Sequence, residues 1–220
     1  MLEVLAILVV LAGYKAATVI NVRFPCLQPL IIAVLLVWFC WWVFSGDWEA
    51  FSSGGSWISF WLGPATVALA VPLATNIKEF AHIWRGVVLG VGAGCGVAIL
   101  SALLIYWSLD FNEAVLRSML SKSVTTPIAL ELARSIGGIP ALAAFFTALT
   151  GFVGTMLARP VLRWAGITDD RAIGIAVGTS AHAIGTASLH RNSPVQTASS
   201  SIAMIVAGIV TSLYLIPFTL

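Results

Sequence analysis

Long apolar runs recur along most of this chain, and they constrain its fold more than any other feature. Each run has about 20 residues, the length that an α-helix needs to cross the hydrocarbon core of a bilayer. The 220 residues are 60% hydrophobic and 9% charged, with a mean hydropathy of +1.01, whereas a soluble domain carries far more charge. A transmembrane barrel would show shorter, alternating segments. The sequence therefore predicts an all-α polytopic membrane protein.

We expect a single transmembrane domain over residues 1–220, with about seven to eight membrane segments. The N-terminal run is interpreted as the first span, because no basic stretch precedes it and no small-residue cleavage site follows it. Lys15, Arg23, Lys78 and Arg85 favour the cytoplasm for the first and third connections, by the positive-inside rule. The expected segments are 2–20, 28–45, 57–76, 84–107, 122–136, 139–158, 172–190 and 197–218.

Two connections have features of their own. The stretch SGDWEAFSSGGS (45–56) is predicted to be a polar, glycine-rich loop, and the amphipathic stretch 109–121 is expected to lie in the membrane interface. Gly86, Gly90 and Gly94 are spaced four apart, which permits close helix packing. Tryptophans crowd around the loop and predict an aromatic belt at one membrane face. They are Trp38, Trp41, Trp42, Trp48, Trp57 and Trp61.

Three segments differ from a simple span, because proline or glycine interrupts them: LGPATVALAVPL (62–73), KSVTTPIALELARSIGG (122–138) and GTSAHAIGTASLHRN (178–192). In lipid, the freed backbone groups need protein partners or a wet cavity. Paired interruptions indicate the binding site of a transporter, so we expect at least two broken or re-entrant helices. Re-entrance of 122–136 would place Arg159, Arg163 and Arg171 in the cytoplasm, whereas eight simple crossings would place them outside.

The second broken segment has the chemistry of an anion site. The residue before Pro127 avoids helical angles, so Ser123, Thr125 and Thr126 are expected to be extended, with a helix starting at the proline. The free N–H groups and the dipole of that first turn favour an anion, and Lys122 adds positive charge. A small carboxylate fits such a site. The alternative is a capped helix start beside a lysine that reaches for the interface.

The third broken segment carries further candidate ligands. Thr179, His182 and Thr186 fall on one helical stripe, and Ser180 lies beside them. His182 can donate to a carboxylate or carry a proton near neutral pH. The alternative for His182 is an interhelical hydrogen bond and nothing more.

Glu131 is a second candidate for carrying a coupled proton, because an ionisable residue at membrane depth is a functional candidate by default. The alternative for Glu131 is structural, since Arg134 lies three residues further along the same helical turn and can pair with it.

Other classes of function find little support. The net charge of +2 gives no nucleic-acid signature. Cys26, Cys40 and Cys95 lie in apolar surroundings without metal or disulfide spacing. Ser180 and His182 lie two residues apart, but no acid–base–nucleophile set, phosphate loop or metal motif accompanies them. We therefore expect no enzyme, no metal and no cofactor.

The LrgB family has signature stretches that four segments of this chain resemble: SKSVTTPIALELA, IGGIPALAAFFTALTG, LGPATVALAVPL and IAVGTSAHAIGTASL. The resemblance extends from the first span to near the C-terminus. Ser121 departs from it, because the family usually has proline there. The family is described as anti-holin-like, linked to murein hydrolase export and autolysis, and usually works beside a small membrane protein, LrgA. It is also similar to the C-terminal part of the plastidal glycolate/glycerate translocator, and some members are associated with pyruvate uptake.

Two hypotheses follow from the anion site and this resemblance together. The first is a secondary transporter of small monocarboxylates, of the glycolate, glycerate, pyruvate or lactate class, driven by proton symport through Glu131 or His182. The second is an anti-holin-like regulator of murein hydrolase export and autolysis that acts with an LrgA-type partner. The resemblance implies a multi-pass protein of the bacterial inner membrane and is compatible with a homo-oligomer.

Overall fold

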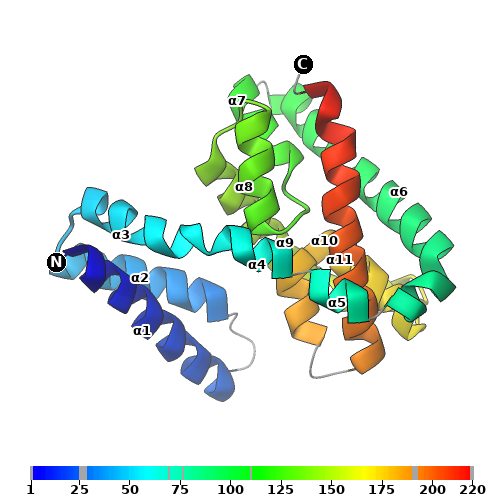
Figure 1. Cartoon of the computed structure of the whole chain (residues 1–220), viewed down its shortest axis with the longest axis horizontal. Helices are drawn as coiled ribbons and strands as arrows, with labels where there is room; N and C mark the ends of the chain where they lie inside the picture. Colours follow the sequence, from blue (N-terminus) through cyan, green and yellow to red (C-terminus); the bar gives the residue numbers. More distant parts are fainter. Residues whose placement is uncertain are drawn as a thin grey trace. The chain divides into compact units, whose positions relative to one another are not determined.

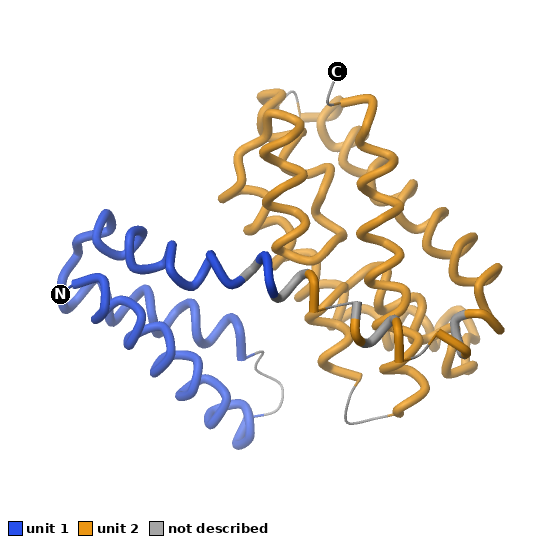
Figure 2. Tube along the Cα trace, in the orientation of Figure 1, with its two compact units in different colours: residues 1–65 blue, residues 66–220 orange. Residues whose placement is uncertain are grey.

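The computed structural model describes residues 2–24, 29–68, 70–75, 77–109, 111–189 and 193–218. The chain divides into two compact units, residues 1–65 and 66–220, and each is described by itself (Figure 2). The expectation of one transmembrane domain over residues 1–220 stays a prediction.

Every regular element in the described ranges is helical, and most of the predicted segments coincide with a helix. The elements are α1 (Leu2–Arg23), α2 (Pro29–Phe44), α3 (Trp48–Phe60), α4 (Leu62–Ala68), α5 (Ala70–Thr75), α6 (Ile77–Leu109), α7 (Glu113–Leu120), α8 (Thr126–Ser135), α9 (Pro140–Trp164), α10 (Asp170–Leu189), α11 (Pro194–Leu215) and the 3₁₀ turn η1 (Ile216–Phe218) (Figure 1).

By length and composition, five of the helices in these ranges could cross a membrane, namely α1, α6, α9, α10 and α11, although α10 is interrupted at His182. Helix α2 is a shorter apolar helix of 16 residues. The chain is therefore a multi-pass helical membrane protein. The finer count of about seven to eight segments stays a prediction. The predicted span at 57–76 is divided among α3, α4 and α5, while Leu69 and Asn76 lie outside the described residues.

The predicted loop at residues 45–56 is wrong, because most of it forms α3. The Asp47 carboxylate accepts the N–H groups of Glu49 and Ala50, at 3.1 and 3.0 Å, and so caps the start of this helix. Gly54 then lets α3 pack closely on α1, since a methyl group there would lie 2.5 Å from the Glu3 carbonyl oxygen. Gly54 therefore serves helix packing, whereas Gly46, with a φ of 67°, lies in the turn before α3.

Replacing Gly54 by valine is expected to destabilise unit 1, because the new side chain would meet the backbone of α1. Overpacking of this kind costs about 1–3 kcal/mol. The measurement is the melting temperature of the purified protein in detergent. Gly55→Val is the matched control, since a methyl group at Gly55 would meet no described atom within 4 Å. Equal melting temperatures for the two variants would contradict the packing role of Gly54.

Five of the six tryptophans of the predicted belt have exposed side chains, so the belt stays a prediction for them. Trp41 is different, because it is fully buried in unit 1 and its indole N–H donates to the Asp47 carbonyl oxygen at 2.8 Å. Trp41 thus fixes the connection between α2 and α3 instead of facing the headgroups.

Unit 2 is built around four helical segments with defined directions. A methyl group at Gly90 would lie 3.7 Å from Ile175, and one at Gly94 would lie 2.7 Å from Thr179, so α6 and the first half of α10 run parallel. Helix α11 runs parallel to α6 as well. The Cys95 thiol of α6 makes a weak contact with the Ala207 carbonyl oxygen at 3.9 Å, and further along both helices Ala102 and Leu215 belong to one apolar cluster.

The fourth segment, α9, runs in the opposite direction. Gly154 lies against Ala181, while Leu162, nearer the C-terminus of α9, packs with Ile173 and Val177, nearer the start of α10. The starts of α6, α10 and α11 and the end of α9 consequently lie at one end of unit 2. We call it the arginine end, because it carries Arg85, Arg159, Arg163 and Arg171.

Helices α7 and α8 form a hairpin at the other end of unit 2, where α6 ends (Figure 1). The Ile139 N–H donates to the Ser118 hydroxyl at 2.7 Å, so the end of α8 lies beside the middle of α7. Residues 121–125 are non-helical and form the tip. The Lys122 amine at this tip reaches the Ala98 carbonyl oxygen, which lies well inside α6.

Helix α10 is a second hairpin, because its backbone reverses at His182, where φ is 38° and ψ is −132°. A methyl group at Gly185 would lie 3.2 Å from the Val177 carbonyl oxygen, although residues eight apart in a continuous helix are separated by about 12 Å. Residues 183–189 therefore fold back along 170–181 towards the arginine end. The sequence predicted breaks in both hairpins, and the described backbone is interrupted at both places.

Candidate functional site

The tip of the first hairpin and the first arm of the second line one groove in unit 2, with a volume of about 990 Å³. Its walls come from the glycine face of α6, the tip of the α7–α8 hairpin, the middle of α9 and the first half of α10. The lining is mostly small or apolar, and its polar side chains are Ser101, Lys122, Ser123, Thr150, Thr179 and Ser180.

Lys122 is the charged residue of this lining. Its amine donates to the Ala98 carbonyl oxygen at 2.7 Å and to the Ser101 hydroxyl at 2.9 Å. An ammonium has three donors, so one is left for a ligand. No carboxylate of the described residues lies within 4.0 Å of the amine. A partly buried cation in an apolar groove without a counter-charge favours an anionic ligand.

Four of the predicted ligands line the groove together: Lys122, Ser123, Thr179 and Ser180. The Thr179 hydroxyl donates to the Ile175 carbonyl and the Ser180 hydroxyl to the Ala176 carbonyl, both at 2.7 Å within α10. Since their protons are used within the helix, these two oxygens are left as acceptors. A carboxylate in the groove would therefore depend mainly on Lys122 for its charge-assisted hydrogen bond.

The four other predicted ligands, Thr125, Thr126, His182 and Thr186, lie outside the lining of this groove. Thr125 is buried at the N-cap of α8 with no partner for its hydroxyl among the described residues, and Thr126 begins the helix. The Thr186 hydroxyl contacts the Ser200 hydroxyl and donates to the His182 carbonyl, both at 2.7 Å. Thr186 thus connects the second hairpin to α11, which is an observation that the linear sequence could not provide.

His182 forms the turn of the second hairpin and is fully buried. Its Nε2 donates to the Thr147 carbonyl oxygen at 2.9 Å, so this nitrogen carries a proton. Gly151 makes room for the ring, because a methyl group there would lie 2.6 Å from the imidazole. The interhelical hydrogen bond that the sequence allowed is therefore present. Nδ1 is buried without a described partner, which fits the neutral ring.

Glu131 does not line the groove. Its side chain is exposed and forms an ion pair with Arg134 on the next turn of α8. Of the two interpretations that the sequence left open, this pair is the one that the structure contains. A role of Glu131 in proton coupling stays a prediction.

Sequence reasoning missed the contribution of α6 to the groove. Gly94 packs closely on Thr179, as the four-residue spacing predicts, but a methyl group at Gly86 would meet no described atom within 4 Å. Gly86 and Gly90 keep the wall of the groove free of side chains. Ser101, which binds the Lys122 amine, lies two turns beyond Gly94, and no sequence signal connected it with the lysine.

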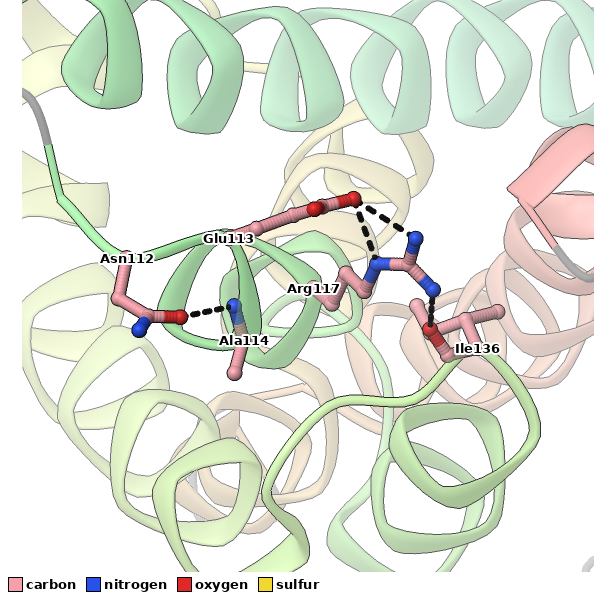
Figure 3. A network of polar contacts seen from close by, with 5 residues as sticks. All are labelled: Asn112, Glu113, Ala114, Arg117 and Ile136. Carbon is pink, nitrogen blue, oxygen red and sulfur yellow. Dashed lines mark hydrogen bonds and ion pairs between the residues drawn. The ribbon is translucent and has the colours of Figure 1, made fainter.

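The base of the α7–α8 hairpin is held by one arginine (Figure 3). The Arg117 guanidinium donates to the Ile136 carbonyl oxygen at 2.6 Å, and it binds the Glu113 carboxylate at 2.7 and 3.1 Å. A cation at the C-terminal carbonyls of α8 also complements the helix dipole. Gly138 packs against the backbone of Ser118, where a methyl group would lie 2.9 Å from its nitrogen. This base fixes the position of the tip that carries Lys122.

Replacing Arg117 by glutamine is expected to loosen the hairpin, because the hydrogen bond from a charged donor to the Ile136 carbonyl is lost. The expected loss of stability is about 1–2 kcal/mol. Hydrogen–deuterium exchange should rise in residues 121–139 and remain unchanged in α11. Arg134→Gln is the control, since Arg134 makes its described pair on the exposed face of α8. Unchanged exchange in the Arg117 variant would show that the hairpin is held by apolar packing alone.

Fold and groove together define a class: helical membrane proteins with opposed helical hairpins around a cationic groove. Comparison with known proteins is more specific. A model of the LrgB-like family matches residues 10–220, and the chain belongs to this family. YxaC of Bacillus subtilis (strain 168), an uncharacterized protein, is 31% identical over 97% of this chain and 94% of its own length. YwbG of the same organism is 34% identical over 90% of this chain and 89% of its own.

A relative with a functional name is the antiholin-like protein LrgB of Bacillus cereus (strain B4264). It is 31% identical to this chain over 208 residues, covering 93% of this chain and 90% of that protein. No solved structure matches.

Proposed function

We propose that the chain is a secondary transporter that carries small monocarboxylates across the bacterial inner membrane, with the anion held at Lys122. The substrates would be of the glycolate, glycerate, pyruvate or lactate class. The observation that carries this proposal is the pair of hairpins, which enter unit 2 from opposite ends, since the tip of the first and the first arm of the second line one groove around a lysine without a described carboxylate partner. Broken helices that meet at an ion or substrate site are typical of secondary transporters.

The lengths of the hairpins support re-entrance. Helix α8 has 10 residues, about 15 Å, against about 30 Å for the hydrocarbon core. With both hairpins re-entrant, α6, α9 and α11 would be the full crossings of unit 2. The arginine end would then face the cytoplasm, by the positive-inside rule.

Uptake of labelled pyruvate, lactate, glycolate and glycerate into proteoliposomes of the purified chain tests the proposal. Saturable uptake that one unlabelled monocarboxylate competes for is expected. The control is Arg163→Gln, which removes a positive charge from an exposed position of α9 and leaves the lining of the groove unaltered. Absence of uptake of all four substrates, with and without ion gradients, would contradict the proposal.

A second candidate function is antiholin-like regulation of murein hydrolase export and autolysis together with an LrgA-type partner. The names of the Bacillus cereus relatives favour this function more directly than they favour transport. It is tested by the rate of autolysis in cells that lack the chain. If Lys122→Ala restores normal autolysis as well as the wild-type chain does, regulation is independent of the groove. If it fails although it is inserted normally, the two functions share one site.

Coupling to protons is the expected energy source, because each hairpin carries a candidate proton carrier, namely Glu131 on the first and His182 at the turn of the second. Wild-type uptake should follow a pH gradient and ignore a Na⁺ gradient. If His182 carries the proton, His182→Asn should abolish pH-driven accumulation and leave exchange of substrate for substrate. Glu131→Gln should do so instead if Glu131 carries it. Uptake that follows Na⁺ and ignores pH would exclude both residues from this role.

A further inference from the structure

The groove has a polar half and an apolar half along α6. Gly94 lies against Thr179, and the Lys122 amine binds Ala98 and Ser101, which follow Gly94 towards the C-terminus of α6. The other polar side chains of the lining lie close by: Ser123 and Ser180 directly follow Lys122 and Thr179 in the chain, and Thr150 lies one turn before Gly154, which packs against the Ser180 carbonyl. The polar side chains of the described lining therefore lie in one half, around Lys122.

The apolar half extends from there towards the arginine end. Its lining residues carry no polar side chain, and they are Gly86, Gly90 and Ala93 of α6 and Ala172, Ile175 and Ala176 of α10. The stretch of α6 from Gly86 to Ala98 is about 18 Å long, at the rise of an α-helix. A three-carbon acid on Lys122 would leave this half of the groove unfilled, whereas an alkyl chain that extends from the carboxylate fits along it.

We infer that the groove prefers monocarboxylates with an apolar side chain of medium length, which place the carboxylate on Lys122 and the chain in the apolar half. This preference rests on the proposed function, since it keeps the anion at Lys122, and it names the substrate class more closely. Burial of the chain is favourable in proportion to its apolar area. The hydroxyl groups of an acid such as glycerate would find no side-chain partner in the apolar half. An apolar pocket with a few polar groups that fix the orientation is typical of small-molecule sites.

Binding of a series of straight-chain acids tests this preference without requiring transport. Acetate, butyrate, hexanoate and octanoate are added to the purified full chain in detergent, below the concentrations at which they form micelles. Affinities follow from the rise of the melting temperature with ligand concentration. Each added methylene group is expected to strengthen binding about two- to fourfold, and glycerate should bind more weakly than butyrate. The uncharged 1-octanol, which has the chain without the carboxylate, should bind more weakly than octanoate.

Variants of the apolar half decide where the chain binds. Ala93→Leu fills this half and should reduce the ratio of octanoate affinity to acetate affinity at least about fivefold. Ala141→Leu is the control, since it makes the same change at an exposed position of α9 outside the lining. Monodisperse elution establishes that each variant is intact. If Ala93→Leu does not fold, Gly90→Leu takes its place, because a methyl group at Gly90 would lie at an ordinary 3.7 Å from Ile175.

Three results would overturn the inference. The first is an affinity that does not rise with chain length. The second is the same rise in Ala93→Leu as in Ala141→Leu, which would mean that alkyl chains bind the lipid-facing surface instead of the groove. The third is octanoate affinity that Lys122→Ala leaves unaltered, which would mean that the groove holds an acyl chain without recognising its charge.

The preference and the proposed transport function can fail separately. Saturable uptake of pyruvate without any dependence of binding on chain length would retain transport and reject the preference. Binding that rises with chain length and depends on Lys122 and Ala93, in a chain that takes up no monocarboxylate, would retain the preference and reject transport.

Discussion

Uptake of monocarboxylate by Lys122→Ala is expected to fall at least about tenfold below that of the wild type at subsaturating substrate. The lysine is the cation that lines the groove, and no described carboxylate neutralises it. A hydrogen bond between charged groups contributes about 1.5–3 kcal/mol, which corresponds to a factor of about 10–150 in affinity. The loss should therefore be seen mainly in KM, measured in proteoliposomes.

Two controls separate this effect from misfolding. Lys122→Arg keeps the charge and should keep part of the uptake, and Ser101→Ala removes one of the two described partners of the amine without removing the charge. Melting temperatures of all three variants should lie close to that of the wild type. The groups that lose a hydrogen bond to the amine are the Ala98 carbonyl and the Ser101 hydroxyl, and both residues line the open groove. Wild-type kinetics in a well-folded Lys122→Ala protein would show that the lysine reaches for the membrane interface and does not bind the substrate.

Gly178→Val is expected to destabilise unit 2 more than Gly54→Val destabilises unit 1. Helices α10 and α11 meet at Gly174 and Gly178, and a methyl group at Gly178 would overlap the Ser200 carbonyl oxygen. Movement of the two backbones apart is opposed by Asp170, which binds Ser193 and Gln196 at the start of α11, and by Thr186, which contacts the Ser200 hydroxyl at the contact itself. We expect a loss of about 3 kcal/mol or more, seen as a melting temperature lowered by several degrees or as failure to purify a monodisperse protein.

Gly86→Val is the matched control in the same unit, because a methyl group at Gly86 would meet no described atom within 4 Å. It should leave the melting temperature unchanged. Similar destabilisation of both variants would mean that valine weakens any helix of unit 2. The close contact at Gly178 would then not be the cause.

The sequence was sufficient to predict the class of fold, because the length of its apolar runs and its low content of charged residues are typical of membrane-spanning helices. It was misleading where one residue type has two uses. Gly54 and Gly55 resemble loop residues, yet Gly54 is a helix-packing position that depends on the distant Glu3. Gly86 and Gly90 resemble packing positions, yet they leave space in the groove. What Gly54 packs on, and the fact that Gly86 packs on nothing described, depend on residues far away along the chain, so no local pattern could distinguish the two uses.

The candidate site was predicted in part. Proline and glycine marked the broken segments, and four of the predicted ligands line one groove, two at the tip of the first hairpin and two in the first arm of the second. The reversal at His182 could not be predicted, since a positive φ at a residue other than glycine is uncommon and depends here on Gly151 and Thr147 of another helix. The contact of Thr186 with Ser200 and the position of Glu131 away from the groove could not be predicted either, because both depend on how distant helices pack.

The short length of α8 also has a consequence for biosynthesis. A ten-residue helix that carries Glu131 and Arg134 is neither long nor apolar enough to leave the translocon as a span. The Ala98 carbonyl is already in place when Lys122 is synthesised, but α9 and α10, which complete the pocket around the tip, are still to come. If the hairpins are re-entrant, as proposed, the first one would stay at the membrane surface until α9 and α10 have been synthesised. Helix length would then set the order of assembly in unit 2, with the long helices partitioning into the lipid first and the hairpins docking afterwards.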